Sequence, residues 1–130
     1  MAELDYAFLA EYASTTGGSL TVVGASFTTL QVPVFPTQIT LYMAGRVRAP
    51  KAADECTLRL SVSPPDDSYQ LEGEAVLDPT GQEPYFEDRV GLLLSVAVPL
   101  PLPDAGLYTV RVFLDSVPVR ELKFTAESVG

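Results

Sequence analysis

The sequence predicts an all-β protein, an antiparallel β-sandwich of about seven to nine strands. Apolar and polar residues alternate with a period of two along most of the chain, as expected for strands that bury one face. The chain contains 11 Pro and 9 Gly among its 130 residues, an abundance typical of proteins with many turns. No segment carries apolar residues at helical spacing over about 12 residues. We therefore expect a single domain, residues 1–130, in which turns connect short strands.

The first two strands are expected to form a hairpin. Residues 4–12 alternate, and the aromatic residues on one face favour a strand over a helix. Two glycines within residues 15–19 indicate a tight turn, and residues 20–24 are the expected returning strand. A bulge marked by glycine is expected at residues 24–27. Residues 31–36 contain two prolines, which predict an edge strand or an extended crossing between sheets.

The middle of the chain predicts three further strands. Residues 39–48 and residues 56–62 alternate, and each is expected to form a half-buried strand. Residues 63–68 are rich in Pro, Asp and Ser and predict a turn. Residues 70–77 predict a strand with a polar outer face, and residues 78–89 predict a longer polar loop.

The C-terminal third predicts a buried strand, an extended segment and a hairpin. Residues 91–98 are continuously apolar, which predicts a central strand covered on both faces. Pro and Leu alternate in residues 99–103, a pattern that favours polyproline II geometry. Residues 107–114 and 117–125 predict a final hairpin that turns at Asp115-Ser116.

A short run at the start of this hairpin gives the sandwich a more specific topology. The run Asp104-Ala105-Gly106-Leu107-Tyr108 resembles the tyrosine corner of immunoglobulin-like sandwiches, in which the Tyr hydroxyl bonds to nearby backbone. Antibody domains have a Cys where this chain has Val110, and they have a core Trp, which this chain lacks. The resemblance therefore implies an antiparallel immunoglobulin-like β-sandwich but no immune-type function.

A second resemblance covers more of the chain. Residues 3–10 (ELDYAFLA) and 18–25 (GSLTVVGA), with Gly106-Leu107-Tyr108 near the end, resemble a family of short bacterial proteins that carry a domain of unknown function. This resemblance implies no activity and no functional residues. Its paired N-terminal hairpin implies that Asp5-Tyr6 and Val23-Gly24 lie near each other.

The charge is concentrated in the middle of the chain. With 17 acidic and 8 basic residues, the net charge is -9. Such a balance opposes nucleic-acid binding, because contacts with phosphates need clustered Lys and Arg side chains. Residues 54–88 hold ten acids and one base, and the flanking segments are each neutral. These acidic residues are interpreted as part of solvated loops and outward strand faces. The alternative is that they form a cation site or the binding surface for a basic partner. Arg46 and Arg48 share a strand face, where they are candidates to pair with this acidic segment or with another copy.

Most catalytic chemistries lack their residues in this chain. It contains no His and one Cys, which excludes a Ser-His-Asp triad, a Cys-His dyad, a His-ligated metal and an internal disulfide. No phosphate-binding glycine motif is present. Glu72 and Glu74 could be considered as a pair of catalytic carboxylates, but their spacing is also that of an outward strand face. No spacing selects a Lys for a Ser–Lys dyad. We therefore expect a protein that is not an enzyme and requires no cofactor.

The sequence predicts a cytoplasmic localisation. The acidic N-terminus lacks the basic region of a secretory signal, and no stretch of about 20 apolar residues predicts a membrane span. The single Cys56 agrees, because secreted domains of this size usually carry paired cysteines.

These observations favour a small non-catalytic protein-interaction or assembly module that acts through its sheet surfaces on a protein partner or a second copy. Four apolar or aromatic side chains are the candidate interaction surface, although a core anchor is the alternative for each: Tyr85, Phe86, Leu100 and Leu102. The competing function is a cation- or small-ligand-binding sandwich that uses acidic loops within residues 66–88. Its candidate ligands are Asp66, Asp67, Asp78, Glu87 and Asp88, with Glu83 beside them.

Overall fold

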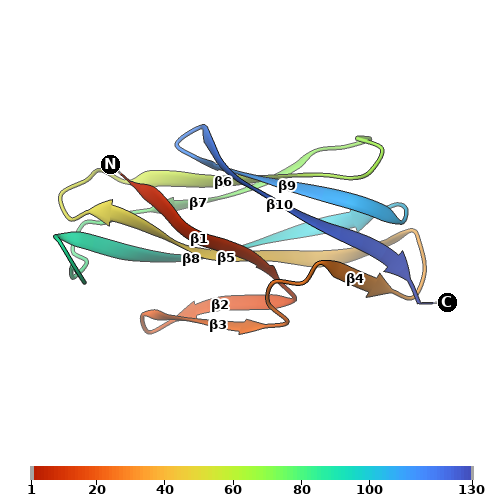
Figure 1. The fold of residues 1–130 in the computed structure, drawn as a ribbon, viewed down its shortest axis with the longest axis horizontal. Coiled ribbons are helices and arrows are strands. Elements are labelled where there is room, and N and C mark those ends of the chain that lie inside the picture. The colour runs from red at the N-terminus through yellow and green to blue at the C-terminus, as the bar shows by residue number, and fades with distance from the viewer. Residues whose placement is uncertain (1, 130) are drawn as a thin grey trace.

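The computed structural model describes residues 2–129, which form ten β-strands and no helix. The all-β prediction is therefore confirmed. The strands form three sheets, with the orders β1-β5-β8, β4-β10-β9-β6-β7 and β2-β3 (Figure 1). Their bounds are β1 (Glu3–Ala10), β2 (Tyr12–Thr16), β3 (Ser19–Val23), β4 (Thr29–Val32), β5 (Thr37–Pro50), β6 (Cys56–Ser63), β7 (Leu71–Leu77), β8 (Arg89–Leu102), β9 (Gly106–Leu114) and β10 (Val117–Ser128).

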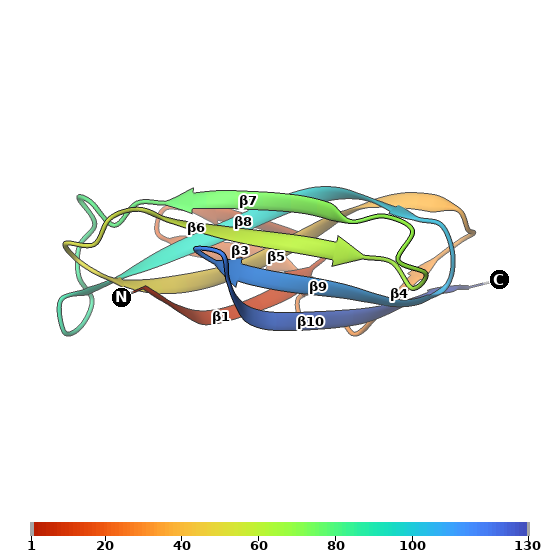
Figure 2. The same ribbon diagram turned by 90° about the horizontal axis from the view of Figure 1, so that it is seen from above.

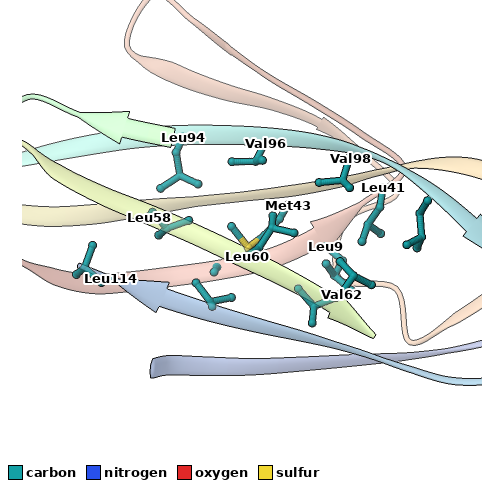
Figure 3. Packing of buried hydrophobic residues seen from close by; sticks show 14 of the residues in the cluster. Leu9, Leu41, Met43, Leu58, Leu60, Val62, Leu94, Val96, Val98 and Leu114 are labelled. Atoms are coloured by element: carbon teal, nitrogen blue, oxygen red, sulfur yellow. The ribbon is translucent and has the colours of Figure 1, made fainter. Parts of the chain in front are cut away.

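The three sheets lie in layers, and the main core fills the space between the two larger ones. Figures 1 and 2 show the β6, β7 and β9 strands over β5 and β8, with the β2–β3 hairpin on the far side of β5 and β8. Leu58 and Leu60 of β6 point toward Met43 of β5 in this core, and all three side chains are at most 1% exposed (Figure 3). Burial of such side chains is the main favourable contribution to folding.

Strand β5 is the centre of the three-stranded sheet. It pairs antiparallel with β1 on one side and with β8, along its whole length, on the other. Leu41, Met43 and Val47 face the main core, whereas the intervening positions, which include Arg46 and Arg48, lie on the outer face of the sheet. The period-two alternation of residues 39–48 therefore predicted this strand and its two faces correctly.

The β2–β3 hairpin covers part of that outer face. Its contact with the sheet is a second, smaller core whose members are Ala10, Ala13 and Ala44, with Phe8, Leu20, Val22 and Tyr42 packed against them. The hairpin turns at Gly17-Gly18, with φ angles of 56° and 84°. Positive φ at both central residues is the geometry of a tight hairpin turn, which explains the two glycines.

The predicted N-terminal strand over residues 4–12 is wrong in its pairing. The predicted strand is interrupted at Glu11, which separates β1 from β2, and only β2 pairs with β3. Tyr6 of β1 lies opposite Arg46, while Val23 lies opposite Tyr12, so the expected proximity of Asp5-Tyr6 to Val23-Gly24 is not found. Alternation assigns side chains to faces but does not select the partner strand.

The segment predicted as a central strand followed by polyproline II is one continuous edge strand. Strand β8 runs from Arg89 to Leu102, and it pairs only with β5 within its sheet. Its apolar residues occupy both faces because one face meets the main core and the other lies beneath the β2–β3 hairpin. Pro99 and Pro101 are tolerated in an edge strand, where a missing N–H need not break a ladder.

Three other local predictions have different outcomes. β9 and β10 form the expected hairpin, and Asp115 and Ser116 turn it with φ angles of 49° and 69°. The edge strand predicted at residues 31–36 is found only in part: β4 is an edge strand, parallel to β10, but it ends at Val32, and both prolines follow it. Residues 24–27 form a turn rather than the predicted bulge, with Gly24 and Ser26 at positive φ. No helix in the described range is long and apolar enough to cross a membrane.

Candidate functional site

A cleft of ≈ 530 Å³ lies between the tip of the β2–β3 hairpin and the loop that joins β7 to β8. The hairpin tip supplies residues 15–18, and the loop supplies Asp78, Glu83 and Tyr85. Arg46 of β5 and Leu93 of β8 lie opposite each other on the outer face of the sheet and form part of the floor. The cleft is therefore built from three separate parts of the chain.

Arg46 is the central side chain of this cleft. Its guanidinium carbon lies 5.2 Å from the ring centroids of both Tyr6 and Tyr85. Tyr6 comes from β1 on one side of β5, and the Tyr85 ring lies over Gly91 of β8 on the other, where a Cβ would come within 3.4 Å of the ring. Arg46 is thus in cation–π contact with two aromatic rings, and each contact orients its planar group.

Asp5 neutralises this arginine. Arg46 Nε donates a hydrogen bond of 2.8 Å to Asp5 Oδ2, and Arg46 Nη2 donates to the same oxygen. The hydrogen bond to Asp5 raises the pKa of the Arg46 guanidinium, which stays protonated. A bulge in β1 between Leu4 and Tyr6 brings the side chains of both Asp5 and Tyr6 to Arg46, although neighbours in a regular strand face opposite ways.

Further ion pairs attach β1 to the neighbouring strands. Arg48 Nη2 lies 3.2 Å from Glu3 Oε1, and its Nε lies 3.8 Å from Asp5 Oδ1. Arg89 Nη1 lies 3.9 Å from Glu3 Oε1. Arg46 and Arg48 therefore pair with acids of β1, not with the acidic segment for which the sequence made them candidates.

Tyr85 and Phe86 form an aromatic rim beside the cleft. Their rings meet edge to face with centroids 4.7 Å apart, and the side chains remain 47% and 39% exposed. The backbone of the rim is held by two hydrogen bonds, Tyr85 N–H to Arg89 O (2.9 Å) and Arg89 N–H to Phe86 O (2.7 Å). This closed turn presents both rings in a defined position.

The structure separates the four side chains that the sequence nominated as an interaction surface. Tyr85 and Phe86 lie together at the surface, but Leu100 and Leu102 are 0% exposed and belong to the main core. Their prolines face outward instead, because residues 99–102 continue the alternation of β8. Leu100 and Leu102 therefore cannot contact a partner in this fold.

The acidic candidates for a cation site also lie apart. Asp66 and Asp67 precede β7, whereas Asp78, Glu87 and Asp88 follow it, so the two groups sit at opposite ends of that strand (Figure 2). Between residues 2 and 129 no three His, Cys, Asp or Glu side chains are grouped to hold a metal ion. Asp66 instead accepts the Ser68 N–H (3.1 Å) and Asp78 accepts the Thr80 N–H (2.9 Å). Hydrogen bonds from Ser68 and Thr80 lower the pKa values of these two carboxyl groups.

We expect millimolar Ca²⁺ to leave the midpoint of thermal unfolding unchanged. Binding to the native state alone would raise the midpoint, and Ca²⁺ needs six or more oxygen ligands that converge. Calorimetry with Ca²⁺ and with EGTA is the measurement, with Mg²⁺ as a control for ionic strength. A rise of several degrees that EGTA reverses would contradict this expectation.

The sequence pointed to Tyr85, Phe86 and the acidic loop of this site, but it did not reveal the Tyr6–Arg46–Tyr85 arrangement. Nothing in the spacing of Tyr6, Arg46 and Tyr85 indicates proximity, since each comes from a different part of the chain. The bulge that brings Asp5 and Tyr6 to one face has no marker, such as a Gly or Pro, in residues 3–10.

Comparisons with known proteins identify a family but no activity. A family model described as "Family of unknown function (DUF6941)" matches residues 5–127. A comparison with curated proteins gives no match. Among solved structures, the chain is similar to the Pseudomonas fluorescens alkylpurine DNA glycosylase AlkC bound to DNA containing an abasic site analog. The identity is 9% and the TM-score 0.46, over 77% of this chain and 28% of that chain. The chain thus spans little more than a quarter of that protein, and this likeness supports no function.

Proposed function

The chain belongs to the DUF6941 family of unknown function, and we propose that it is a small non-catalytic module that binds a segment of a partner protein in the cleft around Arg46. The observation that carries the proposal is the contact of Arg46 with Tyr6 and Tyr85 at a cleft of ≈ 530 Å³. Tyr and Arg are among the residue types that supply most of the binding energy in protein interfaces.

These side chains are ordered before a partner arrives. Arg46 is held by Asp5 and by two rings, and Tyr85 is held by the turn that pairs with Arg89. Binding then costs little additional side-chain entropy, which is otherwise about 0.5–1.5 kcal/mol for each side chain that becomes immobile. The exposed Phe86 ring extends the contact surface beyond the cleft.

We propose in addition that the two larger sheets form an immunoglobulin-like sandwich. Support comes from Tyr108, which is fully buried at the start of β9 and whose hydroxyl donates to the Asp104 backbone oxygen at 2.7 Å. This is the bond of a tyrosine corner. Such folds serve many functions, so the proposed function rests on the cleft and not on the fold.

The test of function is a quantitative pull-down of binding partners from the native cell lysate, read by mass spectrometry. Three baits are compared: the natural chain, Tyr85→Ala and Leu107→Ala. Tyr85 and Leu107 are both 47% exposed, but Leu107 lies on β9 and does not line the cleft. We expect a stoichiometric partner that the natural chain and Leu107→Ala retain. Tyr85→Ala should weaken its binding about 30-fold, as for a hot-spot residue. Affinity is then measured by calorimetry with the purified partner, and circular dichroism verifies the fold of each variant.

Two results would count against the proposed function. The first is a partner that binds Tyr85→Ala as tightly as the natural chain, which would place the interface elsewhere. The second is capture of only a further copy of the chain. That result would favour self-association, which sedimentation equilibrium measures directly.

A further inference from the structure

We infer, on the premise that the cleft binds a partner protein, that the bound segment is basic, with Lys or Arg side chains that enter between the hairpin tip and the β7–β8 loop. The premise concerns where the partner binds, and the inference concerns its charge. The two are tested separately below.

The charge of the cleft lining supports a basic segment. Arg46 is the only basic residue among the described lining side chains, and it pairs with Asp5, which Arg48 shares. Asp78 and Glu83 also line the cleft, and neither forms an ion pair within the described chain. Two carboxylates are therefore left without a counter-charge at the place where a ligand would enter.

The surroundings of the cleft add to this negative potential. The β5–β6 loop, with Asp54 and Glu55, lies at the same end of the molecule as the β7–β8 loop (Figures 1 and 2). The two loops are in contact, because the Lys51 N–H donates to the Asp88 backbone oxygen at 2.9 Å. The nearby basic residues are Arg48, Lys51 and Arg89, and Arg48 and Arg89 both pair with Glu3. Acids thus outnumber bases at this end, and such a field accelerates the approach of a positively charged partner.

The cleft also suits the uncharged parts of Lys and Arg. Val76 and Leu93 line it with apolar surface on which the methylene stems can pack. The partly exposed rings of Tyr85 and Phe86 lie at the rim, and aromatic rings attract cations. A site with carboxylates, aromatic faces and apolar surface matches a basic side chain on a polypeptide better than it matches a bare metal ion.

The test is a titration of ¹⁵N-labelled protein with three probes: an octapeptide of alternating Lys and Arg with one central Leu, the same peptide with Glu at each basic position, and spermidine. We expect the basic peptide to shift the amide signals of residues 15–18 and of the non-proline residues within 78–86. Asp78→Asn with Glu83→Gln should weaken its binding about 10-fold, since each removes a charge that faces the ligand. The matched control, Asp66→Asn with Asp67→Asn, removes the same charge at the other end of β7 and should leave the affinity unchanged.

Each alternative result would overturn the inference in a recognisable way. Equal binding of the acidic peptide, or no effect of the Asp78 and Glu83 substitutions, would show that the cleft does not select a basic segment. An equal loss of affinity for the basic peptide in the Asp66 and Asp67 control would show that the peptide is attracted only by the overall negative charge of the protein. Spermidine binding as tightly as the peptide would identify a small polyamine as the ligand. None of these results affects the Tyr85→Ala capture test, which alone decides whether the cleft is the partner site.

Discussion

Phe124→Ala is expected to lower the free energy of unfolding by about 3–5 kcal/mol, the usual cost of truncating a buried aromatic side chain. Phe124 of β10 is 1% exposed. Its ring stacks on Tyr108 at a centroid distance of 5.2 Å, and it meets the Phe27 ring edge to face at 5.6 Å. Alanine would leave a cavity between β10, β9 and the segment before β4.

Urea denaturation measures this loss, with Leu107→Ala as the control on the adjoining strand. Leu107 is 47% exposed, so its truncation should cost less than about 1 kcal/mol. A similar small cost for Phe124→Ala would mean that the ring does not pack as the structure shows. A loss of cooperativity would appear as a changed slope of the transition, which distinguishes it from a change in stability.

Gly45→Ala is the second substitution with a large expected effect, about 1–3 kcal/mol of lost stability. Gly45 lies in the middle of β5, where β1 approaches so closely that a Cβ would overlap the Tyr6 backbone oxygen and lie 3.1 Å from Ala7 Cα. Both obstacles are backbone atoms, which cannot rotate away. One methyl group would therefore push β1 off β5.

Hydrogen exchange locates this effect. In Gly45→Ala we expect faster exchange of the β1 amides, with little change in the β9–β10 hairpin, which belongs to the other sheet. Because Asp5 and Tyr6 reach Arg46 from β1, the same substitution should also weaken partner binding at the cleft. Unchanged exchange in β1 together with unchanged stability would contradict the close approach at Gly45.

Local patterns were sufficient for elements whose signals lie within a few residues. The β9–β10 hairpin was predicted because alternating runs flank Asp115-Ser116, two residues that suit a tight turn. Strand β6 was predicted because residues 56–62 alternate without interruption. Tyr85 and Phe86 became candidates because they end a long polar loop, and of the two alternatives, a surface contact or a core anchor, the structure shows exposed side chains.

Predictions failed where the environment of a residue depends on a distant segment. The apolar run of β8 was predicted as a central strand covered on both faces, but β8 lies at the edge of its sheet, and its second face is covered by a hairpin from the start of the chain. Leu100 and Leu102 were candidates either for a partner contact or for the core, and the structure places them in the core; the alternation of Pro and Leu does not reveal which face of the chain meets the core. The competing cation-binding hypothesis requires the acidic loops to converge, but β7 separates them.

The sequence by itself determined that this protein is built of strands, where most of them turn, and that its negative charge is concentrated in residues 54–88. These properties follow from side-chain alternation, turn chemistry and composition, which act over short distances along the chain. Only the tertiary structure decided that β1 pairs with β5 and that Arg46 meets Asp5, Tyr6 and Tyr85. The physical reason is that strand pairing joins residues far apart in sequence, and its register is selected by packing across the whole core rather than by any local preference.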